Sequence, residues 1–557
     1  MKSIRIFNTL LFFCFVFLFL QCGNNNIERN IEITAKYLNI PADNSKPKMR
    51  MKIEIDGKGY REFDIKLAEE EPEYWVFLEL SKYMGEEATI ILSDRKAEHK
   101  GFEKLYFSDQ FVGKENLYHE KYRPQFHFSS MRGWNNDPNG LVFFEGEYHL
   151  FYQHNPFGTQ WGNMHWGHAV SRDLIHWQEL PDALIPDKLG AMFSGSAVID
   201  FDNTSGFQSG DDKVMVAIYT AHKKDESGVI QTQCLAFSND RGISWEKYAD
   251  NPVIGDRRIE VESDNIRDPK VFWHNSSEQW VMVLFEGIGN SIFTSKVLKE
   301  WEYQSHIDGF WECPELFELA VDNDPYEKKW VMYGASGTYA IGEFDGKNFI
   351  LESGKHQYHR GNLYAAQTYN NIPESDGRRI QIGWGTIESP GMPFNQMMTF
   401  PSVFTLRTTN NGIRLFYEPI KEIENLHKRK YQWDNISFER INKKISGVES
   451  ELMHIKCEIE NINAVEYGLR IGGDEITYDL NSNSLNGFDY FPDSSGKLMY
   501  FEILVDKTSI EVYVDHGRFH TVIPRNLESE EIGLEFIAGG KIKIKDFALY
   551  ELTSIWK

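Results

Sequence analysis

The sequence is poor in cysteine and in positive charge. Only five of its 557 residues are Cys, and the three beyond residue 30 are far apart and odd in number, so no disulfide framework is visible. The formal net charge is −24. Nucleic-acid binding needs clustered Lys and Arg, so this balance argues against nucleic acid as a partner and fits a neutral or cationic ligand.

Several signatures of cofactor and nucleophile sites are also missing. No Gly-rich loop follows a strand and opens a helix, as a phosphate-binding loop would. There is no Ser-centred nucleophile elbow, and no His or Cys spacing suggests a zinc site. The sequence therefore predicts neither a metal nor a cofactor.

No hydrophobic run near the N-terminus is long enough to span a bilayer. Leu10 to Leu20 form an apolar run of 11 residues, preceded by Lys2 and Arg5, which is typical of an export signal. Cys22 follows at once, with Gly and Asn after it, and resembles the acylated Cys of bacterial lipoproteins. We expect residues 1–21 to be a signal peptide and the protein to be exported and lipid-anchored to a bacterial membrane; an ordinary secretory peptide is the alternative.

Long helical patterns are scarce, and the chain is long enough for several domains. Residues 22–117 contain a polar tether and then alternating apolar runs separated by Gly, Asp and Pro clusters. This pattern predicts a small N-terminal antiparallel β domain. A structural accessory role is favoured for it over carbohydrate binding.

The region 118–415 contains an internal repeat. Strongly apolar strands begin at positions 148, 214, 280, 330 and 379, in steps of 66, 66, 50 and 49 residues. Periods near 40–50 residues with several strands each are typical of propeller blades. The sequence predicts a five-bladed β-propeller.

Three of the repeat units open on an acid followed within two residues by a proline. These acids are Asp137, Asp268 and Glu312, whereas the second unit opens on Phe193-Ser194. The innermost strand of each blade lines the central channel, so acids in matching register would meet at one end of it. Each acid alone would more often belong to a turn, but three in register indicate one site.

The stretch 134–140, Trp-Asn-Asn-Asp-Pro-Asn-Gly, could by itself be either a turn or a site. It runs directly into the apolar strand 141–144, which places Asp137 just before the start of that strand. The loop 161–168 is dense in small, aromatic and amide residues, which indicates packing over a ligand. We expect Trp161 at the pocket and Trp166 in the core.

The C-terminal third alternates again. Residues 416–432 are predicted to form a short helical linker, and residues 433–557 alternate most clearly over 500–514. With recurrent turn signals, this pattern predicts a β-sandwich. Its Asp and Glu residues are expected on the outward faces of strands. The predicted fold class is therefore all-β.

Together these motifs resemble glycoside hydrolase family 32, the invertases, inulinases, levanases and related fructan hydrolases. The matching segments are 136–140, 152–156, 161–168, 193–196, 267–269, 312–314, 364–368 and 392–396. The resemblance covers 118–557, and 503–514 is similar to the family's β-sandwich module. One departure is Asn135, where the family usually has Met. Extra N-terminal β domains occur in some bacterial members.

The resemblance implies retaining hydrolysis of β-fructofuranosidic bonds, which needs two carboxyl groups about 5–5.5 Å apart. Asp137 would be the nucleophile, Glu312 the general acid and then base, and Asp268 the stabiliser of the transition state. The residues implied to line the fructose subsite are Asn136, Gln153, Trp161, Phe193, Ser194, Arg267 and Trp384.

The favoured expectation is exo-acting release of fructose from inulin, levan, fructo-oligosaccharides or sucrose. Endo cleavage within the same family is the first alternative. An inverting glycosidase on the related arabinan-type propeller is a second, and a non-catalytic fructan-binding lipoprotein is a third. The full Asn-Asp-Pro-Asn-Gly and Glu-Cys-Pro contexts favour the β-fructosidases. The expected partners are the fructan and, through the lipid anchor alone, a membrane; nucleic acid is not expected.

Overall fold

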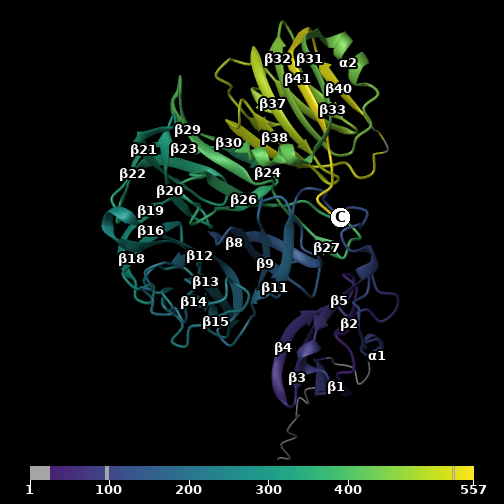
Figure 1. Cartoon of the computed structure of the whole chain (residues 1–557), viewed down its shortest axis with the longest axis vertical. Helices are drawn as coiled ribbons and strands as arrows, with labels where there is room; N and C mark the ends of the chain where they lie inside the picture. The colour runs from purple at the N-terminus through teal and green to yellow at the C-terminus, as the bar shows by residue number, and fades with distance from the viewer. Residues whose placement is uncertain (1–25, 94–98, 530, 532, 557) are drawn as a thin grey trace, which may run out of the picture.

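The computed structural model describes residues 26–93, 99–529, 531 and 533–556. The predicted signal peptide 1–21 and Cys22 lie outside these described residues. Three β-rich parts follow one another along the long axis in Figure 1: an N-terminal domain, a propeller and a C-terminal sandwich. Among the described residues, no helix is long and apolar enough to cross a bilayer.

The N-terminal domain (residues 26–110) is built from two antiparallel sheets. One has the order β1-β6-β3-β4 and the other β5-β2-β7. The strands are β1 (Asn26–Glu32), β2 (Tyr37–Ala42), β3 (Met49–Ile55), β4 (Lys58–Ile65), β5 (Tyr74–Glu79), β6 (Glu87–Ser93) and β7 (Tyr106–Ser108). The short helices η1 (Ser81–Tyr83) and α1 (Lys100–Glu103) connect them, and η2 (Lys114–Asn116) follows. Alternate residues of β3 and β6 are buried and meet in one apolar core. The alternation of apolar and polar residues along each strand therefore builds the core of this domain.

The first four blades of the propeller are antiparallel four-stranded units in chain order. The first two contain β8 (Gly133–Phe144), β9 (Glu147–Asn155), β10 (His165–Ser171) and β11 (Trp177–Leu184), then β12 (Ala191–Asp200), β13 (Val214–Asp225), β14 (Gly228–Ser238) and β15 (Glu246–Lys247). The next two contain β16 (Ile266–His274), β17 (Gln279–Glu286), β18 (Gly289–Ser295) and β19 (Glu302–Asp308), then β20 (Glu315–Val321), β21 (Asp324–Tyr333), β22 (Thr338–Phe344) and β23 (Phe349–Gln357). A 3-10 turn, η3 (Asn275–Ser277), connects β16 to β17.

The fifth blade also closes the ring. It contains β25 (Leu363–Thr368), β26 (Arg379–Gly385), β28 (Met397–Met398), β29 (Ser402–Thr409) and β30 (Gly412–Pro419). The short strand β27 (Phe394–Asn395) pairs in parallel with β8 of the first blade. The repeated strands of the sequence are the second strands β9, β13, β17, β21 and β26, which confirms the five-bladed prediction.

The C-terminal sandwich packs a seven-stranded sheet, β24-β39-β38-β37-β32-β41-β31, on a five-stranded one, β36-β35-β34-β33-β40. The first sheet contains β24 (His359–Gly361), β31 (His427–Ser437), β32 (Met453–Asn461), β37 (Leu498–Val505), β38 (Ser509–Val514), β39 (Phe519–Pro524) and β41 (Ile542–Leu552). The second contains β33 (Glu466–Ile471), β34 (Asp474–Asp479), β35 (Ser484–Leu485), β36 (Phe488–Asp489) and β40 (Leu534–Ala538). Helix α2 (Phe438–Ile445) buries Ile441 and Ile445. The predicted linker 416–432 contains η4 (Lys421–Leu426), while strands enter it from both sides.

One expectation for the sandwich is wrong. Its Asp and Glu residues were expected on outward faces, but Asp506 and Glu511 are fully buried where the sandwich meets the propeller. His127, just ahead of the first blade, lies between them: its Nδ1 is 2.8 Å from Asp506 and its Nε2 is 3.1 Å from Glu511. Alternation along a strand cannot reveal that the second face of a sheet is covered by another domain.

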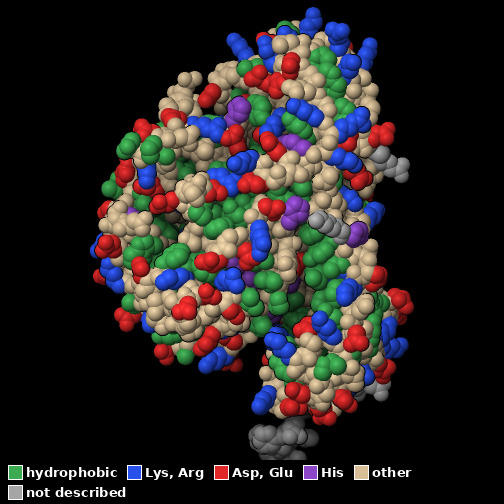
Figure 2. Space-filling view, viewed as in Figure 1, with side chains coloured by type: hydrophobic (Ala, Val, Ile, Leu, Met, Phe, Trp, Pro, Cys, Tyr) green, Lys and Arg blue, Asp and Glu red, His purple; other side chains and the backbone are tan. Residues whose placement is uncertain are grey.

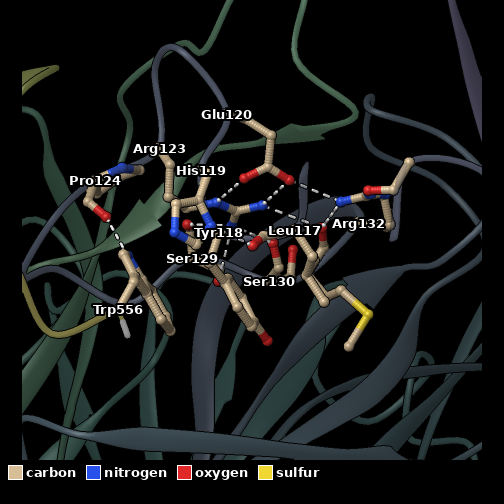
Figure 3. Close-up of polar contacts among 12 residues, drawn as sticks. Leu117, Tyr118, His119, Glu120, Arg123, Pro124, Ser129, Ser130, Arg132 and Trp556 are labelled. Atoms are coloured by element: carbon tan, nitrogen blue, oxygen red, sulfur yellow. Dashed lines mark hydrogen bonds and ion pairs between the residues drawn. The ribbon is translucent and has the colours of Figure 1, made fainter. Parts of the chain in front are cut away.

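A buried ion network holds the segment that joins the N-terminal domain to the propeller (Figure 3). Glu120 accepts hydrogen bonds from Arg123 at 3.0 Å and from Arg132 at 2.8 Å. The ring of Trp556, near the C-terminus, stacks on Tyr118 with centroids 4.2 Å apart. The C-terminal end of the described chain is thereby tied to the segment that precedes the first blade.

Charged side chains of both signs are interspersed over the face shown in Figure 2. On this face, the negative net charge is therefore not gathered into one patch. This distribution does not favour a strongly charged macromolecular partner there.

Candidate active site

The structure brings the three predicted acids together at one end of the propeller axis. Asp137 lies on β8, Asp268 on β16, and Glu312 just before β20. Cys313 links them, because its Sγ lies 3.8 Å from Asp137 Oδ2 and 3.4 Å from Asp268 Oδ2. Its backbone N–H also donates to Asp268 Oδ2 at 3.1 Å. Residues 137, 268 and 312–313 therefore form one cluster drawn from three blades.

Irregular backbone aims these side chains at the axis. The ladders of four inner strands slip in register beside the site, between 135 and 138, 193 and 195, 267 and 270, and 364 and 367. Such bulges re-aim side chains and are common next to active sites. Asp268, Glu312 and Cys313 also have left-handed φ angles of 63°, 45° and 40°. Each left-handed non-glycine residue costs about 1–2 kcal/mol, so the fold stores strain at this point.

Asp137 is oriented by two donors. Ser194 Oγ donates to its Oδ2 at 2.7 Å, and Asn136 Nδ2 donates to its Oδ1 at 3.1 Å. Burial raises the pKa of Asp137, and the negative charge of Glu312 adds to this, while the two hydrogen bonds oppose it. A carboxylate with a raised pKa is a stronger base, and a better nucleophile, than one in water.

Glu312 is fixed by two donors of its own. The guanidinium of Arg267 pairs with Glu312 Oε1, and the hydroxyl of Tyr364 donates to Oε2 at 2.8 Å. Arg267 also lies 3.9 Å from Asp268 and receives support from Asn265, to which its Nη1 donates at 2.8 Å. Arg267 therefore stands between two of the three acids and offsets part of their mutual repulsion.

Asp268 is the acid with the most perturbed environment. Burial raises the pKa of Asp268 to about 7, with further upward contributions from Asp137 and Glu312, while Arg267 acts in the opposite direction. Burial and neighbouring negative charge therefore act on Asp268 in the same direction, and its carboxyl group binds a proton more readily than one in water.

Aromatic side chains form the rim of the site. Trp161 is 58% exposed and meets Phe193 edge-on, with ring centroids 6.0 Å apart. Phe193 stacks on His222 at 4.0 Å. On another side, Trp384 donates its indole N–H to Gln396 at 3.0 Å. Exposed aromatic faces around a polar centre suit a ligand with both apolar C–H and hydroxyl surfaces.

Two other residues discussed from the sequence, Gln153 and Trp166, are buried inside the propeller. Gln153 is almost fully buried and donates to the carbonyl of Met192 at 2.9 Å. Trp166 is fully buried, which confirms its core assignment. Asn135, which the sequence left uninterpreted, is also fully buried, with its Oδ1 3.4 Å from the Ser130 hydroxyl, so it packs behind the site.

Beneath the acids, cross-blade hydrogen bonds fill the propeller axis. We call Lys270, Glu315, Gln367 and Thr368 the axial floor. Lys270 Nζ lies 2.8 Å from Glu315 and donates to the carbonyl of Thr368 at 2.8 Å, while Gln367 donates to the carbonyl of Gly195 at 3.1 Å. A cavity of about 650 Å³ lies on the far side and also includes Lys270. The floor therefore separates that cavity from the acids.

Two residues of the site were not predicted as functional. Tyr364 contacts Glu312, and Cys313 contacts the two Asp carboxylates. Both residues lie inside segments that match the family, 364–368 and 312–314, and this membership was the only signal in the sequence that could have identified them. Within the described part of the chain, no three His, Cys, Asp or Glu residues are grouped so that they could hold a metal ion.

A propeller that holds a buried carboxylate and a second carboxyl group, fixed by Arg and Tyr, inside an aromatic rim has the parts that a glycoside hydrolase requires. Residues 127–419 match the model of the glycosyl hydrolases family 32 N-terminal domain, and residues 23–126 match a domain of unknown function (DUF4980). The chain belongs to glycosyl hydrolase family 32.

Known relatives agree with this assignment. A levanase of Bacillus subtilis is 38% identical over 79% of this chain and 72% of its own length. An extracellular exo-inulinase of Aspergillus ficuum is 31% identical over 79% of this chain and 96% of its own. The crystal structure of an exo-inulinase from Aspergillus awamori, 28% identical, superposes with a TM-score of 0.69 over 79% of this chain and 100% of that chain.

Proposed function

We propose that this protein is a fructan-hydrolysing β-fructofuranosidase that retains configuration and releases fructose from chain ends. The observation that carries the proposal is the convergence of Asp137, Asp268 and Glu312 around Cys313. The relatives named above act on levan and inulin, by their names. The substrate class inferred for this chain is therefore a β-linked fructan or a short fructoside.

In the first half of the reaction, Asp137 attacks the anomeric carbon of the terminal fructosyl unit. Ser194 and Asn136 leave a lone pair of Asp137 free and fix its direction. Glu312 gives its proton to the glycosidic oxygen as that bond breaks, and a fructosyl ester forms on Asp137. Asp268 accepts hydrogen bonds from sugar hydroxyls while positive charge develops on the ring.

In the second half, Glu312 takes a proton from water, and the water oxygen attacks the same carbon. The ester bond breaks, fructose leaves with its original configuration, and Asp137 is free again. Tyr364 and Arg267 keep the Glu312 carboxyl group in place between its two tasks. Two successive displacements therefore account for retention.

The decisive experiment follows the first-released sugar by NMR during hydrolysis of a fructoside. The β anomer of fructose should appear before mutarotation, and initial appearance of the α anomer would exclude the retaining scheme. The variant Asp137→Ala should lose turnover while its circular dichroism and melting temperature stay close to wild type. Turnover near the wild-type rate in this variant would show that another group is the nucleophile.

Exo action is supported by the name of one relative, the extracellular exo-inulinase of Aspergillus ficuum. Early products from inulin and levan give the test. Fructose alone supports the proposal, whereas a ladder of oligomers would show that the alternative, endo cleavage, is correct.

We propose in addition that the protein is exported and lipid-anchored through Cys22. The support is the sequence pattern of Leu10–Leu20 followed by Cys22. Expression of the full chain in a bacterial host should place it in the membrane fraction with incorporated fatty acid. The variant Cys22→Ser should carry no fatty acid, and equal labelling of both proteins would contradict the assignment.

A further inference from the structure

The loop that carries Trp161 lies between the N-terminal domain and the active-site rim. We call residues 156–163 the Trp161 loop. It follows β9 of the first blade, and its one exposed aromatic, Trp161, contacts Phe193 beside Ser194. Ser194 in turn donates to Asp137. A displacement of this loop would therefore change the side-chain arrangement at the entrance of the active site.

The N-terminal domain contacts this loop through an aromatic stack and through two hydrogen bonds between a loop side chain and the backbone of β4. Phe63 of β4 stacks on Phe157 with centroids 3.7 Å apart and planes at 10°. The Asp64 N–H donates to Asn163 Oδ1 at 2.8 Å, and Asn163 Nδ2 donates back to the Asp64 carbonyl at 2.8 Å. Asn163 thus binds the edge of β4 as a neighbouring strand would.

Side-chain contacts from the same domain hold the middle of the loop. Asn44 Nδ2 donates to Thr159 Oγ1 at 2.8 Å, and Lys66 Nζ donates to Gln160 Oε1 at 2.7 Å. These partners directly precede Trp161 in the sequence. The indole is therefore anchored from 157 to 163 by residues that lie outside the propeller.

The propeller holds the loop from the opposite side. Asn155, the last residue of β9, accepts from Asn163 Nδ2 at 3.0 Å and donates to the Gln160 carbonyl at 2.7 Å. Asn395 donates to the Thr159 carbonyl at 3.2 Å and accepts from the backbone N–H of Gln396, the residue that holds Trp384. The loop is therefore the junction through which the N-terminal domain reaches both rim tryptophans.

We propose that the N-terminal domain is a positioning element of the active site, which fixes the Trp161 loop so that Trp161 is preorganised to stack on the bound fructoside. This inference rests on the function proposed above. A rigid aromatic that is already held in place loses little freedom on binding. Phe63 and Asn163 are positioning residues, because they act on the substrate through Trp161.

Two variants loosen the loop in different ways. Phe63→Ala removes the stack on Phe157, and Asn163→Asp puts a carboxylate oxygen where an amide N–H now faces the Asp64 carbonyl. Both should raise KM for sucrose and levan about 3- to 10-fold while kcat stays within about twofold, because the lost interaction is a binding one. A matched control is Phe102→Ala, which truncates a buried Phe of the same domain's core on α1.

A double-mutant cycle tests the route through the indole. In a Trp161→Ala background, Phe63→Ala should change KM by less than about twofold, because the residue it positions is gone. All assays are run well below the melting temperature of each variant. Unchanged KM in Phe63→Ala and Asn163→Asp, an equal rise in Phe102→Ala, or an effect of Phe63→Ala that persists without Trp161 would each overturn the proposal. A wild-type protein inactive on every β-fructoside would instead refute the proposed function.

Discussion

The buried contact of His127 with Asp506 and Glu511 should make the joint between propeller and sandwich sensitive to alkaline pH. Both imidazole nitrogens face carboxylate oxygens, so only the doubly protonated ring donates to both. Burial lowers the pKa of His127, but the two carboxylates together outweigh it and raise the pKa to about 9. The folded protein therefore keeps a proton on His127 that the unfolded chain releases near pH 6.5.

The magnitude follows from that difference. A pKa raised from 6.5 to about 9 corresponds to roughly 3 kcal/mol of folding free energy. Because the folded pKa is the higher one, this stabilisation is complete below pH 6.5 and is lost as pH rises to about 9. His127 also lowers the pKa of Asp506 and Glu511, whose contribution is lost only as pH falls into the acid range.

The perturbation is His127→Gln, which keeps a hydrogen-bonding side chain but cannot carry the charge. Removing one partner of a buried ion cluster costs about 3–5 kcal/mol. Urea unfolding of both proteins is measured from pH 6 to pH 9.5, and the difference in stability is taken at each pH. Subtraction removes the general effect of increasing negative charge. The difference should be largest at pH 6 and should fall by about 3 kcal/mol toward pH 9.5.

A difference that stays constant over this range would refute the reasoning, because it would show that the proton on His127 does not stabilise the fold. An increase toward pH 9.5 would do so more strongly. A second readout is Phe400, whose backbone N–H donates to Glu511 at 2.8 Å and should lose protection from hydrogen exchange in the variant.

Three further outcomes are expected at the active site. Ser194→Ala removes a hydrogen bond that lowers the pKa of Asp137, so the acid limb of the plot of kcat/KM against pH should move to higher pH. An unmoved limb would show that Ser194 does not affect the pKa of the nucleophile. Tyr364→Phe removes the donor to Glu312 and should lower kcat about 10- to 100-fold with little change in melting temperature; a wild-type kcat would contradict the positioning role. A thiol reagent should leave the native protein, produced without residues 1–25, unmodified until it is unfolded, because burial raises the pKa of all three cysteines beyond that point, Cys234, Cys313 and Cys457.

Much of the architecture could be predicted because it depends on local pattern. The second strands β13 and β17 contain nearly continuous apolar runs, and β3 and β6 alternate, so sequence spacing located them. β2 shows no such alternation, because its residues from Leu38 to Ala42 are all buried and include Pro41. A strand covered on both faces gives no alternation to detect.

The site was predictable in its composition but not in its geometry. Asp137, Asp268 and Glu312 stand in matching contexts, which the repeat exposed. The left-handed backbone of Asp268 and Glu312 left no trace, because neither position is a glycine. Contacts between distant segments, such as Phe63 with Phe157, depend on domain packing that no local spacing encodes.

The axial floor has a consequence for how a polymer is shortened. Among the described residues, Lys270, Glu315, Gln367 and Thr368 close the axis below the acids, so under the proposed exo action a released sugar leaves by the opening through which the chain end entered. The shortened polymer must therefore withdraw before the sugar departs. The enzyme then hydrolyses one bond per binding event. All polymer chains in a sample should therefore shorten at the same time instead of being degraded completely one after another.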